Sequence, residues 1–243
     1  MSNDSYKEFS QIYDLLMNVD MDYNKWTAFI KEKLGKKNKI LEAACGTGNI
    51  TSILSENYKI TAFDLSEDML MKAYEKLDRN TGVKLLNQNM IDFKIDDKFD
   101  ACICCCDGVN YLNEEEVLLF FQRVQQHLKK QGIFLFDIST DYKYETTFND
   151  TYVYDDGDVF YVWENMIEEE SNEVNVEINF FVKEKNEKYN RITEFQTQYI
   201  HIANEISSNL KSCGFSDIEI YDDYNNVKYS ENSLRAVFIC KLN

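Results

Sequence analysis

A short glycine-containing stretch carries the residue types of a ligand-binding turn. The segment KILEAACGTGNIT, residues 39–51, passes from apolar residues to Gly46 and Gly48 and continues in a helical pattern. Glycine lets a backbone turn tightly after a buried strand and brings amide groups close to a ligand at a helix N-terminus. The stretch therefore predicts a nucleotide-type cradle, and a plain strand-to-helix turn is the alternative for the two glycines alone.

Two kinds of cofactor commonly use such a turn, and the spacing of the small residues separates them. A dinucleotide fingerprint places a third small residue where this chain has Thr51. Threonine at that position disfavours an NAD-dependent oxidoreductase, which is kept as an alternative.

The turn resembles the first motif of class I S-adenosylmethionine-dependent methyltransferases, an acidic residue followed by alternating small residues. Ala44 stands at the first glycine of the family pattern, a replacement that the family often shows, and Glu42 replaces the commoner aspartate. The resemblance implies S-adenosyl-L-methionine as the cofactor. It also implies a first set of cofactor-binding residues, namely Glu42, Ala43, Ala44, Cys45, Gly46, Thr47 and Gly48.

Later segments follow the order of the same family's motifs. ITAFDLSEDML ends the second predicted strand on Asp64, where the family places a carboxylate whose two oxygens accept both ribose hydroxyls. LLNQNMIDF resembles the segment that holds adenine, with Asn89 in place of the usual aspartate and Met90 packed on the ring. The resemblance adds Leu65 and Met69 to the cofactor-binding set. A helix cap for Asp64 and a plain loop position for Asn89 are the alternatives.

A segment after the fourth predicted strand is similar to the part of small-molecule methyltransferases that lies beside the methyl group. In CCCDGVNYL, the resemblance places Cys106 at the cofactor and puts Asp107, Asn110 and Tyr111 next to the acceptor. These three residues would orient the acceptor and receive its proton.

The N-terminal segment YKEFSQIYDLLM is similar to a covering helix of the same subgroup. In that subgroup tyrosines close over the cofactor, which gives this role to Tyr6 and Tyr13. Both tyrosines also recur at helical spacing, so packing in a core is the alternative. Sugar-amine N-methyltransferases and glycine N-methyltransferase are the relatives that the resemblance suggests.

The elements that must position these residues alternate between strands and helices, as in a mostly parallel sheet covered on both faces. Strands are predicted over residues 39–45, 59–65, 83–89, 99–106, 133–139, 215–221 and 235–242. Helices are predicted before the first strand, from Asn49, from Ser66, over 113–130 with a C-terminal Gly132, and over 205–212. The fold class is therefore α/β: a Rossmann-like, seven-stranded, mostly parallel sheet with an antiparallel last strand at its edge.

Residues 140–204 break this alternation and predict an inserted antiparallel β lid. No helix is expected directly after Thr140, and VNVEINFFV places apolar residues on one face of a strand. Two further strands are expected over 160–168 and 192–202. Residues 1–139 and 205–243 would then form the cofactor-binding core with N-terminal covering helices, and residues 140–204 a lid for acceptor recognition.

Other reactive side chains have two interpretations each. His201 ends the third inserted strand and is a candidate general base, although a structural or solvent-facing role is favoured, and His127 is expected on the polar side of the long helix. Acidic lid residues are expected to form a solvated face rather than an amine site: Asp155, Asp156 and Asp158. Lid aromatics are expected to be pocket walls or core: Tyr161, Trp163 and Phe180.

The cysteine cluster predicts no metal site. Cys102, Cys104, Cys105 and Cys106 alternate across a strand, and no second CxxC or histidine pair supplies further ligands. Small buried thiols are the expectation.

Composition narrows the class of protein. With 243 residues and 44% hydrophobic content the chain can bury a full core, and a formal charge of −17 disfavours nucleic acid as a partner. Neither a membrane span nor a signal peptide is apparent, and seven cysteines suit a reducing, cytoplasmic location. A monomer or homodimer is expected. The sequence therefore predicts a methyltransferase of small molecules, with nitrogen favoured over oxygen as acceptor atom; a non-catalytic cofactor-binding module is a second alternative.

Overall fold

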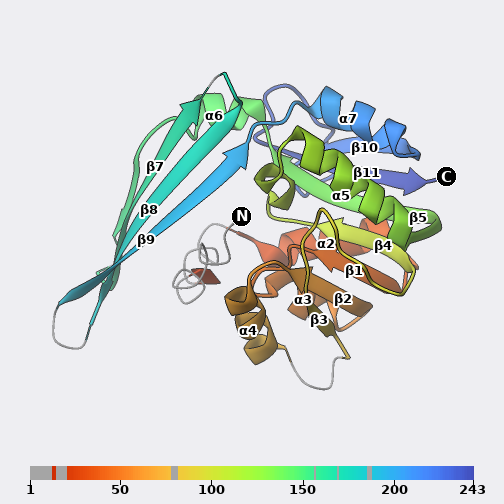
Figure 1. Cartoon of the computed structure of the whole chain (residues 1–243), viewed down its shortest axis with the longest axis horizontal. Helices are drawn as coiled ribbons and strands as arrows, with labels where there is room; N and C mark the ends of the chain where they lie inside the picture. Colours follow the sequence, from red (N-terminus) through yellow and green to blue (C-terminus); the bar gives the residue numbers. More distant parts are fainter. Residues whose placement is uncertain (1–12, 15–20, 78–81, 156, 169, 185–187) are drawn as a thin grey trace.

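Two β-sheets organise the chain, which the computed structural model describes over residues 13–14, 21–77, 82–155, 157–168, 170–184 and 188–243. The larger sheet has seven strands in the order β10-β11-β5-β4-β1-β2-β3. The second has four strands in the order β6-β7-β8-β9 and projects away from the first (Figure 1). No helix in the described part of the chain is long and apolar enough to cross a membrane.

The seven-stranded sheet is Rossmann-like and mostly parallel. In spatial order its strands are β10 (Phe215–Asp222), β11 (Arg235–Leu242), β5 (Leu128–Ser139), β4 (Phe99–Cys104), β1 (Lys39–Ala43), β2 (Lys59–Asp64) and β3 (Lys84–Asn87). β11 runs antiparallel to both of its neighbours, as predicted. The prediction that it is the edge strand is wrong, because β10 pairs on its outer side.

Helices cover both faces of this sheet. α2 (Tyr23–Leu34) and α3 (Asn49–Leu54) pack on one face, and α5 (Glu114–His127) and α7 (Ala203–Ser212) pack on the other (Figure 1). Successive residues of a strand point to opposite faces, so Ile40 belongs to the first core and Leu41 to the second. This double burial explains why β1 is apolar almost throughout.

The long helix α5 is shorter than predicted. Asn113 and Glu116 form a reciprocal capping box at its start, and the chain passes directly from His127 into β5 at Leu128. Gly132 is therefore no helix cap; it lies inside β5, where an added Cβ would come within 2.8 Å of the Lys129 carbonyl oxygen. His127 is not on a polar face either, since it is buried against Phe93.

The second sheet differs from the predicted insertion in two ways. Its strands are β6 (Tyr152–Asp155), β7 (Val159–Glu168), β8 (Glu173–Lys183) and β9 (Tyr189–Tyr199), all antiparallel, so it has one strand more than expected. A short helix, α6 (Asp141–Thr146), follows β5 directly, where no helix was expected. Thr140 caps it by accepting from the Lys143 amide. Short segments of this kind carry too few apolar positions for a periodic pattern.

The inner face of the second sheet has its own apolar cluster. Val174, Val176, Ile178 and Phe180 are buried there, as the alternation predicts, with Tyr161 and Trp163 packed beside them. Neither Tyr161 nor Trp163 lines the cavity described below, so in the described residues both belong to this cluster.

Replacing Phe136 by alanine tests the main core. Phe136 is fully buried on β5 and stacks on Phe238 with 4.9 Å between ring centroids. The change should lower the free energy of unfolding by about 3–5 kcal/mol, because it leaves a cavity in a packed interior. Leu119→Ala on the exposed side of α5 is the control and should change it by less than about 1 kcal/mol. If urea unfolding shows the same loss of unfolding free energy in Phe136→Ala and Leu119→Ala, the packing described here is contradicted.

Candidate active site

The glycine-containing turn after β1 is bound to the end of β2 through Asp64. Ala44, Gly46 and Gly48 all have positive φ angles, which produces the tight turn into α3. The Gly46 amide donates to Asp64 Oδ2 over 2.8 Å, and the Ser66 amide donates to Oδ1 over 2.9 Å. Asp64 therefore orients the turn and caps nothing itself, since Ser66 is the N-cap of α4 (Glu67–Lys76).

A cavity of about 420 Å³ extends from this turn to the base of the second sheet. Its size suits a cofactor or a small ligand. Ten predicted site residues line it: Tyr13, Ala44, Gly46, Asp64, Leu65, Met69, Asn89, Met90, Cys106 and Tyr111. Seven of them follow or end β1, β2, β3 and β4, while Met69 lies in α4, Tyr111 lies in η2 (Gly108–Tyr111) and Tyr13 precedes β1.

Eight other predicted residues are not among the lining residues: Glu42, Ala43, Cys45, Thr47, Gly48, Asp107, Asn110 and His201. Tyr6 lies outside the described residues. Thr47 faces a polar cluster instead, with its hydroxyl 2.5 Å from Asp14 Oδ1, and Lys76 forms an ion pair with Asp14 over 2.7 Å.

The turn and its neighbourhood concentrate carboxyl groups. Glu42 is buried beneath the turn with Oε2 unpartnered, and burial raises its pKa to about 8. Burial also raises the pKa of Asp64. In the described residues the ionisable carboxylates that line the cavity are Asp64 and Glu116, and no lysine or arginine lines it. These groups fit a cofactor that carries positive charge and a ribose diol, as S-adenosylmethionine does.

Asn110 is a structural clamp. Its amide nitrogen donates to the carbonyl oxygens of Ser139 (3.1 Å) and Tyr199 (3.0 Å), and its oxygen accepts from the Ser139 amide (2.9 Å). The side chain is fully buried and joins the short helix η2 (Gly108–Tyr111) to the ends of β5 and β9. Asn110 therefore couples the second sheet to the floor of the cavity.

Asp107 and His201 also face away from the cavity. The Asp107 carboxylate accepts from the Ser139 hydroxyl over 3.0 Å and lies near Arg235, whose positive charge, opposing burial, holds the pKa of Asp107 below its usual value. His201 is buried, with Nε2 3.0 Å from the Leu112 carbonyl oxygen, and burial lowers its pKa. A buried imidazole held by backbone is placed to support η2 rather than to meet an acceptor.

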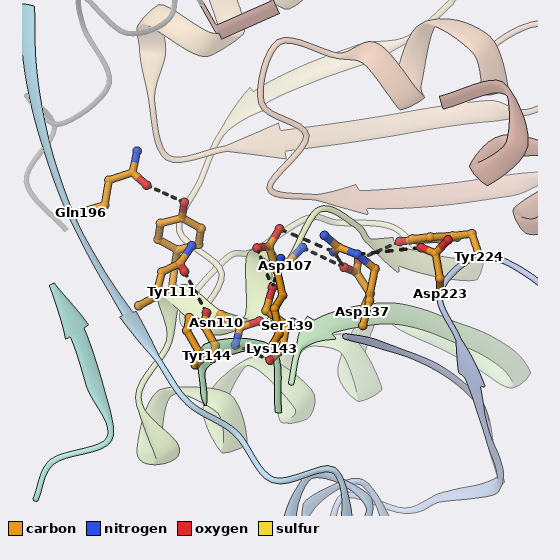
Figure 2. Close-up of polar contacts among 12 residues, drawn as sticks. Asp107, Asn110, Tyr111, Asp137, Ser139, Lys143, Tyr144, Gln196, Asp223 and Tyr224 are labelled. Carbon is orange, nitrogen blue, oxygen red and sulfur yellow. Dashed lines mark hydrogen bonds and ion pairs between the residues drawn. The ribbon is translucent and has the colours of Figure 1, made fainter. Parts of the chain in front are cut away.

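Twelve lining residues escaped the sequence reasoning, and four of them come from the second sheet: Phe195, Gln196, Thr197 and Tyr199 on β9. Figure 2 shows Gln196 facing Tyr111, whose hydroxyl donates to Gln196 Oε1 over 2.8 Å. Polar Glu194, Gln196 and Gln198 alternate on the buried face of β9. That polar alternation on an inward face was the available signal for Gln196, while Phe195, Thr197 and Tyr199 alternate with it on the other face of the strand.

The cysteines divide between the two cores. Cys102 and Cys104 lie in the α5-side core, Cys105 lies in the α2-side core, and Cys106 is half-buried at the cavity. No group of three or more potential metal ligands occurs in the part of the chain that is described.

The comparisons with known proteins identify the family. Residues 40–132 match the methyltransferase domain family. The chain is 35% identical over 237 residues to the putative methyltransferase YqeM of Bacillus subtilis, covering 96% of this chain and 95% of that protein. The chain belongs to the class I methyltransferases, and its cofactor is S-adenosylmethionine. This membership decides against an NAD-dependent oxidoreductase.

Solved structures agree over nearly the whole chain. An S-adenosylmethionine-dependent methyltransferase from Clostridium acetobutylicum has a TM-score of 0.88 and 35% identity, covering 98% of this chain and 99% of that one. The sugar N-methyltransferase KedS8 from Streptoalloteichus shares the fold, with a TM-score of 0.77 and 18% identity over 95% of this chain and 92% of that one.

Replacing Glu42 by glutamine should stabilise the ligand-free protein in a pH-dependent way. Between pH 4.5 and about pH 8 the unfolded carboxyl ionises while the buried one stays protonated, so wild-type stability falls across this window. The variant cannot ionise at this position and lacks that loss. Its free energy of unfolding relative to wild type should therefore increase by about 3 kcal/mol from pH 5 to pH 8. Urea unfolding at both values measures it. A stability difference that does not vary with pH would contradict a protonated Glu42.

Proposed function

We propose that this methyltransferase transfers the methyl group to the nitrogen of a small-molecule amine. The charge of the cavity supports this best, because its ionisable lining in the described residues is carboxylate without a lysine or arginine. An anionic acceptor would be repelled there, whereas a protonated amine is attracted and can pass its proton to a lining carboxylate such as Glu116 before transfer. The solved neighbours KedS8 and CalS10 are a sugar N-methyltransferase and an amino pentose methyltransferase.

Binding follows from the residues at the strand ends. The backbone of the turn at Gly46 and the Asp64 carboxylate would hold the nucleoside side of the cofactor, with Asn89 and Met90 at the other end of the same wall. When bound, the cofactor supplies an already activated methyl group. The chain therefore has to align the acceptor and exclude water, and such alignment can lower a barrier by about 7–11 kcal/mol.

The second sheet would select the acceptor. Residues 140–204 form the proposed lid for acceptor recognition, and residues 1–139 and 205–243 the proposed core. Tyr111 from the core and Gln196 from β9 line the cavity and bond to one another, so the acceptor-side wall is shared between the two. A polar pair of this kind would orient an acceptor through hydrogen bonds, while Tyr13 covers the cavity from the N-terminal side.

Asp64→Ala should abolish most of the thermal stabilisation by S-adenosylhomocysteine. The variant loses the oxygens that hold the Gly46 amide and would meet the ribose. A thermal-shift titration measures the change in Tm at saturating ligand for each protein, so that any loss of intrinsic stability cancels. Glu67→Ala, at the exposed start of α4, is the matched control and should keep the wild-type shift. An unchanged shift in Asp64→Ala would remove Asp64 from the site.

A metabolite-pool incubation tests the acceptor class. Wild-type protein is incubated with methyl-labelled S-adenosylmethionine and a bacterial small-molecule extract, and mass spectrometry locates the label. We expect a labelled product in which nitrogen carries the methyl group, absent with Asp64→Ala. A labelled ether or ester would contradict the choice of nitrogen. Binding of the cofactor with no labelled product would favour a non-catalytic cofactor-binding module.

A further inference from the structure

A buried charged cluster lies behind the cavity, at the ends of β4, β5 and β11. Arg235 begins β11, and its side chain is only 9% exposed. Its Nη1 forms an ion pair with Asp137 on β5 and lies 3.6 Å from Asp107 Oδ1 after β4. Figure 2 shows Asp107, Ser139 and Asp137 side by side in this cluster, with Tyr224 at its far end.

Aromatic rings fix the position of the guanidinium. Arg235 lies over the ring of Trp26 at 4.9 Å from its centroid, and Trp26 stacks on Tyr224 with centroids 4.2 Å apart. The Tyr224 hydroxyl donates to Asp137 Oδ1 over 2.7 Å. The arginine is therefore held by an aromatic face on one side and by carboxylates on the other, which lowers the cost of burying its charge.

The other end of the cluster holds a strained turn. Cys106 and Asp107 have φ angles of 60° and 49°, two consecutive non-glycine residues in the left-handed region. Such conformations cost free energy and persist only where the surroundings enforce them. Here the Asp107 amide donates to Asp137 Oδ2 over 3.0 Å, and the Asp107 carboxylate accepts from Ser139.

The strained turn is also part of the cavity wall. Cys106 and Gly108 line the cavity on either side of Asp107, and Tyr111 follows in η2. A Cβ at Gly108 would lie 2.9 Å from Cys104 Sγ, so the turn is packed closely against β4. Small movements of Asp107 would therefore displace the wall at the end of the cavity that faces β9.

We propose that Arg235 is a positioning residue for methyl transfer, which through Asp137 and Asp107 holds the left-handed Cys106–Asp107 turn in the cavity wall. Without the guanidinium, Asp107 and Asp137 are two neighbouring carboxylates with Lys143 as the remaining cation beside them, and their repulsion or protonation releases the amide from which Asp137 accepts. The turn then relaxes while the cradle at β1 and β2 stays in place. The assignment of the cavity end near β9 to the acceptor rests on the proposed function, and the rest of the proposal does not.

Three measurements on Arg235→Met and Arg235→Lys test the proposal. They are the Kd of S-adenosylhomocysteine by calorimetry, the rate of Cys106 alkylation by iodoacetamide followed by peptide mass spectrometry, and the rate of transfer from labelled cofactor in the metabolite pool. Arg235→Met should label Cys106 several-fold faster, because the exposure gained when the turn is released outweighs the reactivity lost with a positive charge that lowers the pKa of that thiol. The same variant should transfer methyl at least roughly tenfold more slowly, with Kd little changed. In Arg235→Lys, both the labelling rate and the transfer rate should lie between those of Arg235→Met and wild type. Arg191→Met, at an exposed position near the start of β9 and outside the cavity lining, is the matched control and should behave as wild type.

Clear outcomes overturn the proposal. Wild-type rates in Arg235→Met would do so, as would a loss of cofactor affinity as large as the loss of transfer. If Arg235→Met fails to fold, Arg235→Lys and Tyr224→Phe decide, because Tyr224→Phe removes one hydrogen bond to Asp137 and should accelerate Cys106 labelling. If the wild type transfers to no acceptor, the proposed function fails, while the labelling rates and Kd values still decide the role of Arg235.

Discussion

Buried carboxyl groups at the carboxyl ends of parallel strands are the constraint that the rest of the structure meets. Four such carboxylates belong to neighbouring strands or the turns after them: Glu42, Asp64, Asp107 and Asp137. Arg235 and Lys143 compensate the last two from within the protein. Glu42 and Asp64 face no cation in the described residues, and burial raises the pKa of both. A cofactor with positive charge would favour the ionised form of both carboxyl groups, so cofactor binding and their protonation are linked.

The two sheets meet at the strand ends that carry these carboxyl groups. Asn110 joins η2 to β5 and β9, Tyr111 bonds to Gln196, and Lys143 on α6 donates to Ser139, which in turn bonds to Asp107. The second sheet is thus attached through the same strand ends that form the cavity. A movement of β9 would therefore displace the Cys106–Asp107 turn through these hydrogen bonds. Such a connection suits a lid that recognises the acceptor.

Local sequence motifs predicted the cofactor side of the site. The acceptor side depends on contacts between residues that are distant in the sequence, which such motifs do not reveal. Gly46 and Asn89 follow strands and Asp64 ends one, each in a readable motif, and all three line the cavity. The resemblance of CCCDGVNYL to the family's segment beside the methyl group placed Asp107 at the acceptor, yet its partner Arg235 comes from the last strand. The edge position of β11 was wrong for the same reason: periodicity identifies a strand, but strand order depends on contacts distant in sequence.

The most direct test of the central claim is proton linkage on binding. Calorimetric titration of S-adenosylmethionine at pH 7, in buffers of different ionisation enthalpy, counts the protons exchanged. Since ligand-free Glu42 has a pKa of about 8, a bound cation should expel its proton, giving an enthalpy that depends on the buffer in the wild type and not in Glu42→Gln. Absence of binding, or the same proton release in both proteins, would contradict the account.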